Sequence, residues 1–142
     1  MLQDLPQFQF QCFACGGVHT EVAAPTCPDC DAPLSLALSS YPDASVLTTR
    51  PQSMWDYHAL LPVPSDADIV SLGEGATPMV SSPALAEKHV LGAVDLKNEM
   101  GNPTGSFKDR QVAVGINWAR SQGHDTVAVV SSGNVAASTA AY

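Results

Sequence analysis

Residues 102–110 read Asn-Pro-Thr-Gly-Ser-Phe-Lys-Asp-Arg, and this stretch decides how the C-terminal half of the sequence folds. Its proline and glycine are typical of a loop, and Ser106, with Asp109 three residues later, indicates the start of a helix. Lys108 then lies in the first helical turn, where the helix dipole disfavours a charged amine by about 0.3–1 kcal/mol. That position suits a neutral amine that attacks a carbonyl group. A solvated lysine paired with Asp109 is the alternative interpretation.

The segments on either side predict alternating strands and helices. Residues 93–97 have the composition of a short strand, and the helix that begins at Ser106 ends at Gly123. Its apolar face consists of Val112, Ile116 and Ala119. Residues 126–130 are a mostly β-branched run, typical of a strand buried on both faces. Strand, helix and strand in this order predict a parallel sheet with a right-handed crossover.

A second loop, Ser-Ser-Gly-Asn at residues 131–134, follows this predicted strand directly. Ligands of open α/β sheets bind beyond the carboxyl ends of the strands, so we expect this loop to face the same edge as the loop before Lys108. Backbone N–H groups at a helix start suit a carboxylate, and the amide of Asn134 suits a phenolic oxygen. Residues 135–142 carry no helix stop signal, so we expect the N-terminal part of a longer polypeptide. A small complete domain with a frayed last helix is the alternative.

Near the other end of the sequence, four cysteines occur as two C-x2-C pairs separated by eleven residues. They are Cys12, Cys15, Cys27 and Cys30. Four thiolates form a closed tetrahedral shell for a structural Zn²⁺, with no open position for a substrate; disulfides or bound iron are the alternatives. We expect His19 to be a surface residue, because the cysteines already complete the shell. So short a segment buries little core, and the metal supplies its folding energy.

Three regions follow from these observations: a zinc ribbon at 1–36, a connecting arm at 37–68, and an α/β region at 69–142. The arm is rich in proline, serine and threonine. Ser53 is a candidate N-cap for a short helix that Pro62 ends. Trp55 and Tyr57 in this helix are expected to anchor the arm against the region that follows.

Composition excludes several classes of protein. The chain has 142 residues and a formal net charge of −8, so it lacks the basic surface that nucleic-acid binding requires. Its apolar runs are too short to cross a bilayer, and residues 1–11 contain no basic residue of the kind that begins a secretory signal. We therefore expect a cytoplasmic protein with no nucleic-acid or membrane partner, in which reduced cysteines bind metal.

The motifs at 102–110 and 131–134 resemble the lysine motif and the asparagine loop of the pyridoxal-phosphate (PLP) enzymes of fold type II. Within that superfamily, the chain is similar to the threonine synthase family. This similarity rests on Ser-Leu-Gly-Glu-Gly-Ala-Thr-Pro at 71–78, on the arm at 53–62 and on the four-cysteine ribbon. The resemblance implies an incomplete three-layer α/β domain with a parallel sheet, preceded by a small ribbon with four cysteine ligands.

The resemblance also implies roles for single residues. Lys108 would hold PLP and then move protons, and Asn134 would contact the 3-hydroxyl of the cofactor. The substrate carboxylate would be bound by Ser131, Ser132, Gly133 and Asn134. The implied reaction, that of a carbon–oxygen lyase, converts O-phospho-L-homoserine and water into L-threonine and phosphate. The substrate would be a small amino acid, and the longer enzyme is compatible with a homodimer.

Three positions depart from the family pattern: Gln111 replaces a usual glycine, Val135 a usual hydroxyl or histidine, and Asp56 a usual arginine. The glycine-rich phosphate loop of the family has no counterpart in residues 1–142, so we expect the isolated chain to be inactive. Other enzymes of the superfamily, such as cysteate synthase or threonine dehydratase, use the same lysine and are alternatives. A truncated, non-catalytic zinc-binding product is the alternative from another class.

Overall fold

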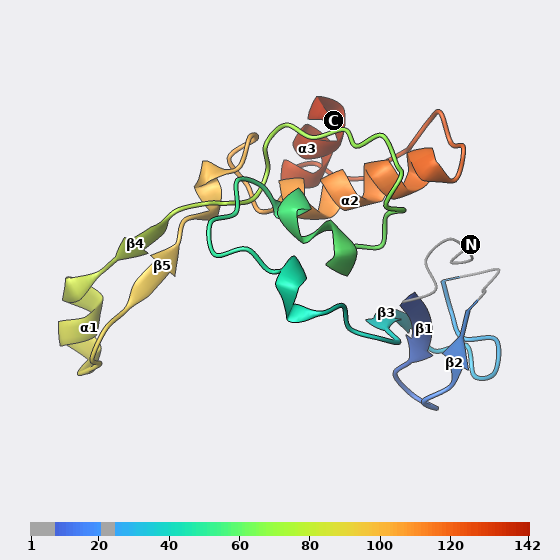
Figure 1. Cartoon of the computed structure of the whole chain (residues 1–142), viewed down its shortest axis with the longest axis horizontal. Helices are drawn as coiled ribbons and strands as arrows, with labels where there is room; N and C mark the ends of the chain where they lie inside the picture. Colours follow the sequence, from blue (N-terminus) through green and yellow to red (C-terminus); the bar gives the residue numbers. More distant parts are fainter. Residues whose placement is uncertain (1–7, 21–24) are drawn as a thin grey trace.

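The computed structural model describes residues 8–20 and 25–142, and its N-terminal part is an antiparallel sheet. The strands lie in the order β2-β1-β3; they are β1 (Phe8–Cys12), β2 (Val18–His19) and β3 (Leu34–Leu38). Phe8 is 5% exposed and pairs with Leu38, and Phe10 and Trp118 pack against it. Trp118 belongs to helix α2 (Lys108–Ser121). This apolar cluster therefore joins the sheet to the C-terminal half of the chain (Figure 1).

The connecting arm carries two 3₁₀ helices, η2 (Ala44–Val46) and η3 (Met54–Leu60). Ser53 caps η3 as predicted, because its hydroxyl accepts the backbone N–H of Trp55 at 3.1 Å. The Asp56 carboxylate accepts the N–H groups of Gln52 and Ser53, at 2.6 and 3.1 Å. Ser53 and Asp56 thus form a capping box. The acid at position 56, a departure from the family pattern, is what holds the start of this helix.

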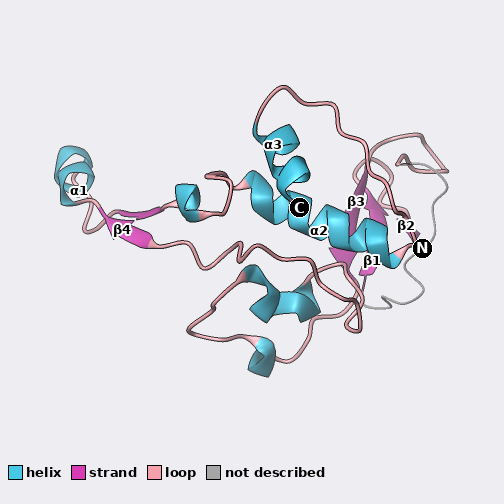
Figure 2. Ribbon diagram, turned by 90° about the horizontal axis from the view of Figure 1, so that it is seen from above, coloured by secondary structure: helices cyan, strands magenta, loops and turns pink. Residues whose placement is uncertain are grey.

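A two-stranded antiparallel ribbon projects from one end of the molecule (Figures 1 and 2). Its two strands are β4 (Met79–Ser81) and β5 (Asp95–Lys97), and helix α1 (Pro83–His89) lies in the segment that connects them. Met79 pairs with Lys97 and Ser81 with Asp95, and all six strand residues are exposed. Pro83 is the first helical residue, as its missing N–H favours.

The C-terminal half is helical. A short 3₁₀ helix, η4 (Glu99–Gly101), precedes α2, and α3 (Asn134–Ala141) packs against α2. Of the apolar face predicted for α2, Val112 and Ala119 are buried and Ile116 is half-buried. Ala113 is buried as well. Among the described residues, no helix is long and apolar enough to cross a membrane.

The parallel sheet expected from the sequence is not formed among the described residues. Strand β5 pairs with β4 in antiparallel orientation, not with residues 126–130. Residues 126–130 form no ladder, and Val127, Val129 and Val130 are exposed. A strand requires a neighbour for its N–H and C=O groups, and no described strand borders this segment. The described residues are therefore mixed α and β, and they do not form the three-layer arrangement.

Candidate functional site

Lys108 is the first residue of α2, and Phe107 is the N-cap. The Ser106 hydroxyl accepts the backbone N–H of Lys108 at 3.3 Å. The lysine ammonium lies 4.6 Å from the centroid of the Phe107 ring. In the part of the chain that the structure describes, this amine has no hydrogen bond or ion pair, so the alternative of a Lys108–Asp109 pair is not formed.

Asp109 differs from the sequence expectation, because it does not form a capping box with Ser106. Its side chain is fully buried, and it accepts the Thr104 N–H at 2.7 Å and the Thr104 hydroxyl at 2.5 Å. It also accepts the Ser138 hydroxyl of α3 at 2.6 Å. Burial by itself raises the pKa of Asp109, but the hydrogen bonds from Ser138 and Thr104 outweigh it and lower the pKa. The ionised carboxylate thereby fixes the loop before Lys108.

The bond between Asp109 and Ser138 also places the second predicted loop. Asn134 begins α3, one helical turn before Ser138, so these two residues lie on one face of α3. Because Ser138 contacts the neighbour of Lys108, the second turn of α3 lies beside the first turn of α2. Residues 131–134 are exposed, and the Ser131 hydroxyl accepts the Gly133 N–H at 3.2 Å. The structure thus places Ser138, one helical turn after Asn134, against the residue that follows Lys108.

A charged cluster holds the other side of the lysine motif. Arg110 binds Glu99 through two hydrogen bonds of 2.7 and 2.8 Å. Glu99 also accepts the Thr77 hydroxyl at 2.7 Å and the Asn102 amide at 3.0 Å. Asn102 in turn accepts the N–H of Gly75 at 3.0 Å. The Arg110 guanidinium, followed by the hydroxyl and amide donors, lowers the pKa of Glu99 to about 2.

We predict that this cluster loses its stabilising effect in acid. The folded-state pKa of Glu99 is below its usual value of 4.5, so its contribution is complete above pH 4.5 and is lost as the pH falls toward 2. Arg110→Met should lower the free energy of unfolding by on the order of 1–3 kcal/mol at pH 7. Urea unfolding from pH 7 to 2.5 should show this difference shrinking.

Arg120→Met is the matched control, because Arg120 pairs with an Asp68 carboxylate that is 97% exposed. Such a pair contributes about 0–1 kcal/mol, so this variant should change stability little. A pH-independent effect of Arg110→Met would contradict the role assigned to Glu99.

A third carboxylate, Glu74, joins the arm to α3. It is fully buried and accepts the Trp55 indole N–H at 2.5 Å and the Tyr142 hydroxyl at 2.7 Å. The Ser71 hydroxyl and the Leu72 N–H donate to it at 3.1 and 2.9 Å. Burial raises the pKa of Glu74, but the hydrogen bonds, led by that from Tyr142, outweigh it and lower the pKa. Trp55 anchors the arm as expected, whereas the Tyr57 hydroxyl donates to Thr48 within the arm.

Gly75 allows the arm to approach this carboxylate closely. It adopts a φ of +93°, and a Cβ at this position would lie 2.4 Å from the Met54 backbone nitrogen. The Met54 N–H donates to the Glu74 carbonyl at 2.9 Å. No side chain fits there, so Gly75 is required for contact between the arm and the lysine-bearing region.

Sequence reasoning missed the structural roles of Glu74 and Glu99. It also missed Asn117, which is 1% exposed and holds both backbone groups of Val70 at 2.7 Å. Asn117 lies outside the predicted apolar face of Val112, Ile116 and Ala119, so that pattern held no signal for it. No local signal links Glu99 to Arg110, which is eleven residues away.

The four cysteines form the second candidate site. Their sulfur atoms lie within 4.8 Å of one another, with Cys12–Cys30 at 3.4 Å and Cys15–Cys27 at 3.7 Å. Sulfurs around a tetrahedral Zn²⁺ are about 3.8 Å apart, given Zn–S bonds of about 2.3 Å. The backbone N–H of Cys15, and then that of Ala14, lower the pKa of Cys12 to about 6. The donor set fits a divalent metal ion that binds thiolates.

His19 lies against this cluster and is not the surface residue expected from the sequence. Its side chain is 16% exposed, and its Nε2 lies 3.6 Å from the Cys27 sulfur and 3.5 Å from the Asp29 carboxylate. The pairing of β2 with β1 places it there, with His19 opposite Phe10. The prediction considered only whether His19 was needed as a fifth metal ligand, and it did not consider a contact with one of the cysteines.

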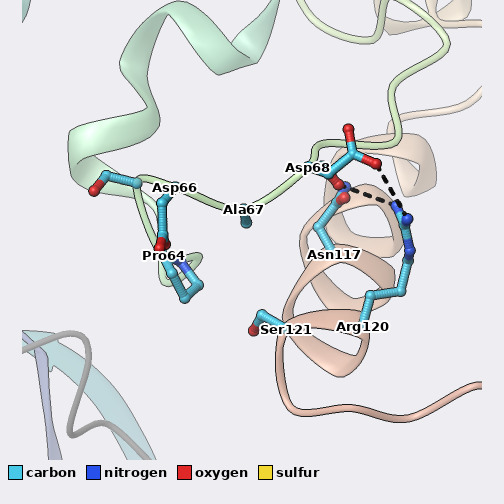
Figure 3. Close-up of a pocket in the computed structure, with 8 residues that line it drawn as sticks. Pro64, Asp66, Ala67, Asp68, Asn117, Arg120 and Ser121 are labelled. Carbon is cyan, nitrogen blue, oxygen red and sulfur yellow. Dashed lines mark hydrogen bonds and ion pairs between the residues drawn. The ribbon is translucent and has the colours of Figure 1, made fainter.

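An open hollow of about 730 Å³ lies at the other end of α2 (Figure 3). Residues 64–68 form one wall, and Asn117, Arg120 and Ser121 form the other. Arg120 pairs with Asp68, and Asn117 is bound to Val70, so these side chains of the hollow already have partners. At 1.5 Å per helical residue, Arg120 lies about 18 Å along α2 from Lys108. The hollow is therefore separate from the lysine site.

Residues 70–142, which contain Lys108 and the loop at 131–134, match the family described as pyridoxal-phosphate dependent enzyme. The chain belongs to this family.

Several curated relatives of the chain are threonine synthases. The chain is 37% identical over 139 residues to that of Methanosarcina acetivorans, covering 95% of this chain and 34% of the relative. It is 43% identical over 96 residues to the threonine synthase of Methanocaldococcus jannaschii, covering 68% of this chain and 24% of the relative. It is also 43% identical over 86 residues to the threonine synthase of Mycobacterium leprae, covering 61% of this chain and 24% of the relative. The chain thus spans about a third or less of the length of these relatives.

Proposed function

We propose that this chain is the N-terminal part of a threonine synthase, which converts O-phospho-L-homoserine and water into L-threonine and phosphate. The amine of Lys108 carries the proposal. It has no hydrogen bond or ion pair among the described residues, yet Glu99 and Asp109 hold the segment around it in place. An amine kept available on a fixed backbone is what covalent catalysis by lysine requires. The similarity to several threonine synthases supports the substrate.

The residues present fit PLP, because they offer an amine for its aldehyde and amide or N–H donors for its oxygen. When bound, PLP supplies an electron sink for the carbanion chemistry. We assign Lys108 to hold the cofactor through Nζ and to move protons at that atom. We assign Asn134 to the cofactor 3-hydroxyl. The backbone N–H groups of the exposed residues Ser131, Ser132 and Gly133, together with Asn134, would bind the substrate carboxylate, and the Gly133 N–H would exchange its bond to the Ser131 hydroxyl for one to the substrate.

The four-cysteine cluster is proposed as a structural zinc site. Cys12, Cys15, Cys27 and Cys30 would fill the tetrahedral shell, which leaves no coordination position for substrate. The 139-residue match covers 95% of the chain and so takes in this segment as well as the lysine motif. The metal would hold the small sheet together and take no part in the reaction.

The finer points of the architecture belong to the same proposal. A longer polypeptide would supply the remaining strands of a three-layer parallel sheet and the donors for the PLP phosphate, which is a dianion that needs several N–H groups. Exposed Val127 and Val129 would become buried in such a sheet. The longer enzyme would be cytoplasmic and, as one option, a homodimer.

The proposal predicts covalent labelling of a single lysine. In the longer polypeptide, PLP followed by borohydride should leave the reduced cofactor on Lys108, as located by peptide mass mapping, and Lys108→Arg should abolish the adduct. The exposed Lys88 is the control position, and Lys88→Arg should keep it. The variants that form the adduct should also release phosphate from O-phospho-L-homoserine, and Lys108→Arg should not. The 142-residue chain alone should release no phosphate.

An adduct on Lys88 or Lys97 would contradict the assignment. Labelling of Lys108 without phosphate release from this substrate would favour another fold type II enzyme, such as a cysteate synthase or a threonine dehydratase. No labelling at all would favour a non-catalytic zinc-binding protein.

A further inference from the structure

The imidazole of His19 occupies a position that the four-cysteine site does not need. Its Nε2 lies 3.6 Å from the Cys27 sulfur, within the range of an N–H···S hydrogen bond, and 3.5 Å from an oxygen of Asp29. Cys27 is 2% exposed, and its sulfur is the one that the imidazole contacts. Asp29 lies between Cys27 and Cys30 in the second cysteine pair. The histidine therefore contacts the second pair twice, from a strand that follows the first pair.

Gly17 leaves the space in which this contact forms. A Cβ at Gly17 would lie 3.2 Å from His19 Nε2, 3.1 Å from the Asp29 carboxylate and 3.3 Å from the Cys15 sulfur. Cys15 of the first cysteine pair, Asp29 of the second pair and His19 of β2 thus converge over a residue without a side chain. The imidazole is held by strand pairing on one side and by this convergence on the other.

We propose that His19 is a positioning residue of the metal centre, whose Nε2–H is shared between the Cys27 thiolate, at 3.6 Å, and the Asp29 carboxylate, at 3.5 Å. A thiolate that accepts a hydrogen bond carries its charge at lower cost and keeps its position as a ligand. The bond also ties β2 to the second cysteine pair, so that the pair opens less readily. His19 would slow the release of the metal without binding it. This inference rests on the proposed zinc site.

The test compares His19→Phe, which keeps a ring but has no N–H, with His19→Gln, which keeps an N–H donor. Each protein is loaded with zinc, and the transfer of the metal to a chromogenic chelator is timed. We expect His19→Phe to release zinc about 10-fold to 100-fold faster than the unchanged chain. Metal affinity typically falls by this factor when a residue that hydrogen-bonds a metal ligand is removed. We expect His19→Gln to recover most of the difference. His89→Phe, at an exposed position of α1, is the matched control and should not change the rate.

Cobalt substitution separates this role from coordination. The visible absorption of the cobalt-loaded His19→Phe protein should keep the intensity and stoichiometry of a four-thiolate site. A changed cobalt spectrum would make His19 a ligand and overturn the proposal. Equal release rates for the Phe variant and the unchanged chain would also overturn it. Failure of the unchanged chain to bind zinc or cobalt would instead refute the zinc site itself, which is a distinguishable result.

Discussion

Cys12→Ser should abolish stoichiometric zinc binding and unfold the sheet of β1, β2 and β3. Cys12 ends β1, is 3% exposed, and lies 3.4 Å from the Cys30 sulfur. Few other side chains of this sheet are buried, so its apolar core is too small to fold by itself. Apparent binding free energies of structural zinc in small domains are about 10–16 kcal/mol. The metal is therefore expected to dominate the stability of residues 8–38.

Elemental analysis of the purified chain should give about one zinc per molecule, expected from a closed four-thiolate shell, and well below that for Cys12→Ser. Limited proteolysis should cut the variant, or the chelator-treated chain, between β1 and β3 while sparing α2. Ser35→Ala on β3 is the matched control, since it changes the same sheet without touching a sulfur. Resistance of the zinc-free chain to proteolysis would show that the sheet folds without metal.

Glu74→Ala should be the most destabilising change outside the metal site. The substitution leaves the Trp55 indole N–H and the Tyr142 hydroxyl without their acceptor, at 2.5 and 2.7 Å in the unchanged protein. Each donor left unpaired in a buried position costs roughly 1–3 kcal/mol. We expect a loss of about 3 kcal/mol or more in the free energy of unfolding. Urea unfolding, followed by tryptophan fluorescence, measures it.

Glu87→Ala provides the comparison, because Glu87 is exposed on α1 and such surface changes stay within about 0.5 kcal/mol. Tyr142→Phe removes one donor and should cost less than Glu74→Ala, since the carboxylate keeps its other three donors. Equal stability of Glu74→Ala and Glu87→Ala would mean that the arm and α3 are not joined through this carboxylate.

Local patterns were read correctly where neighbouring residues decide the outcome. The serine at position 53 was predicted as the cap of a short helix and is confirmed. Lys108 lies in the first turn of α2, as expected. The spacing of the cysteines predicted a cluster, and the structure brings their sulfurs together. In each case the interaction is completed by chain geometry over a few residues, or by ligand spacing.

Contacts between residues that are distant in the sequence were not predicted. Asp109 was expected to pair with Ser106, three residues away, but its carboxylate instead accepts the N–H and hydroxyl of Thr104 and the hydroxyl of Ser138 from α3. Residues 126–130 were expected to be a buried strand, yet β-propensity alone does not supply a neighbouring strand. The position of His19 was misjudged because it follows from the register of β2 on β1.

By itself, therefore, the sequence determined the metal-binding spacing, the helix starts and the lysine that the family match covers. Only the tertiary structure decided how that lysine is held. Glu74 meets Tyr142 across 68 positions, and Asp109 meets Ser138 across 29. A carboxylate can be buried only where donors from elsewhere in the chain reach it. Those donors are brought together by packing of the arm, α2 and α3, which no local pattern of residues specifies.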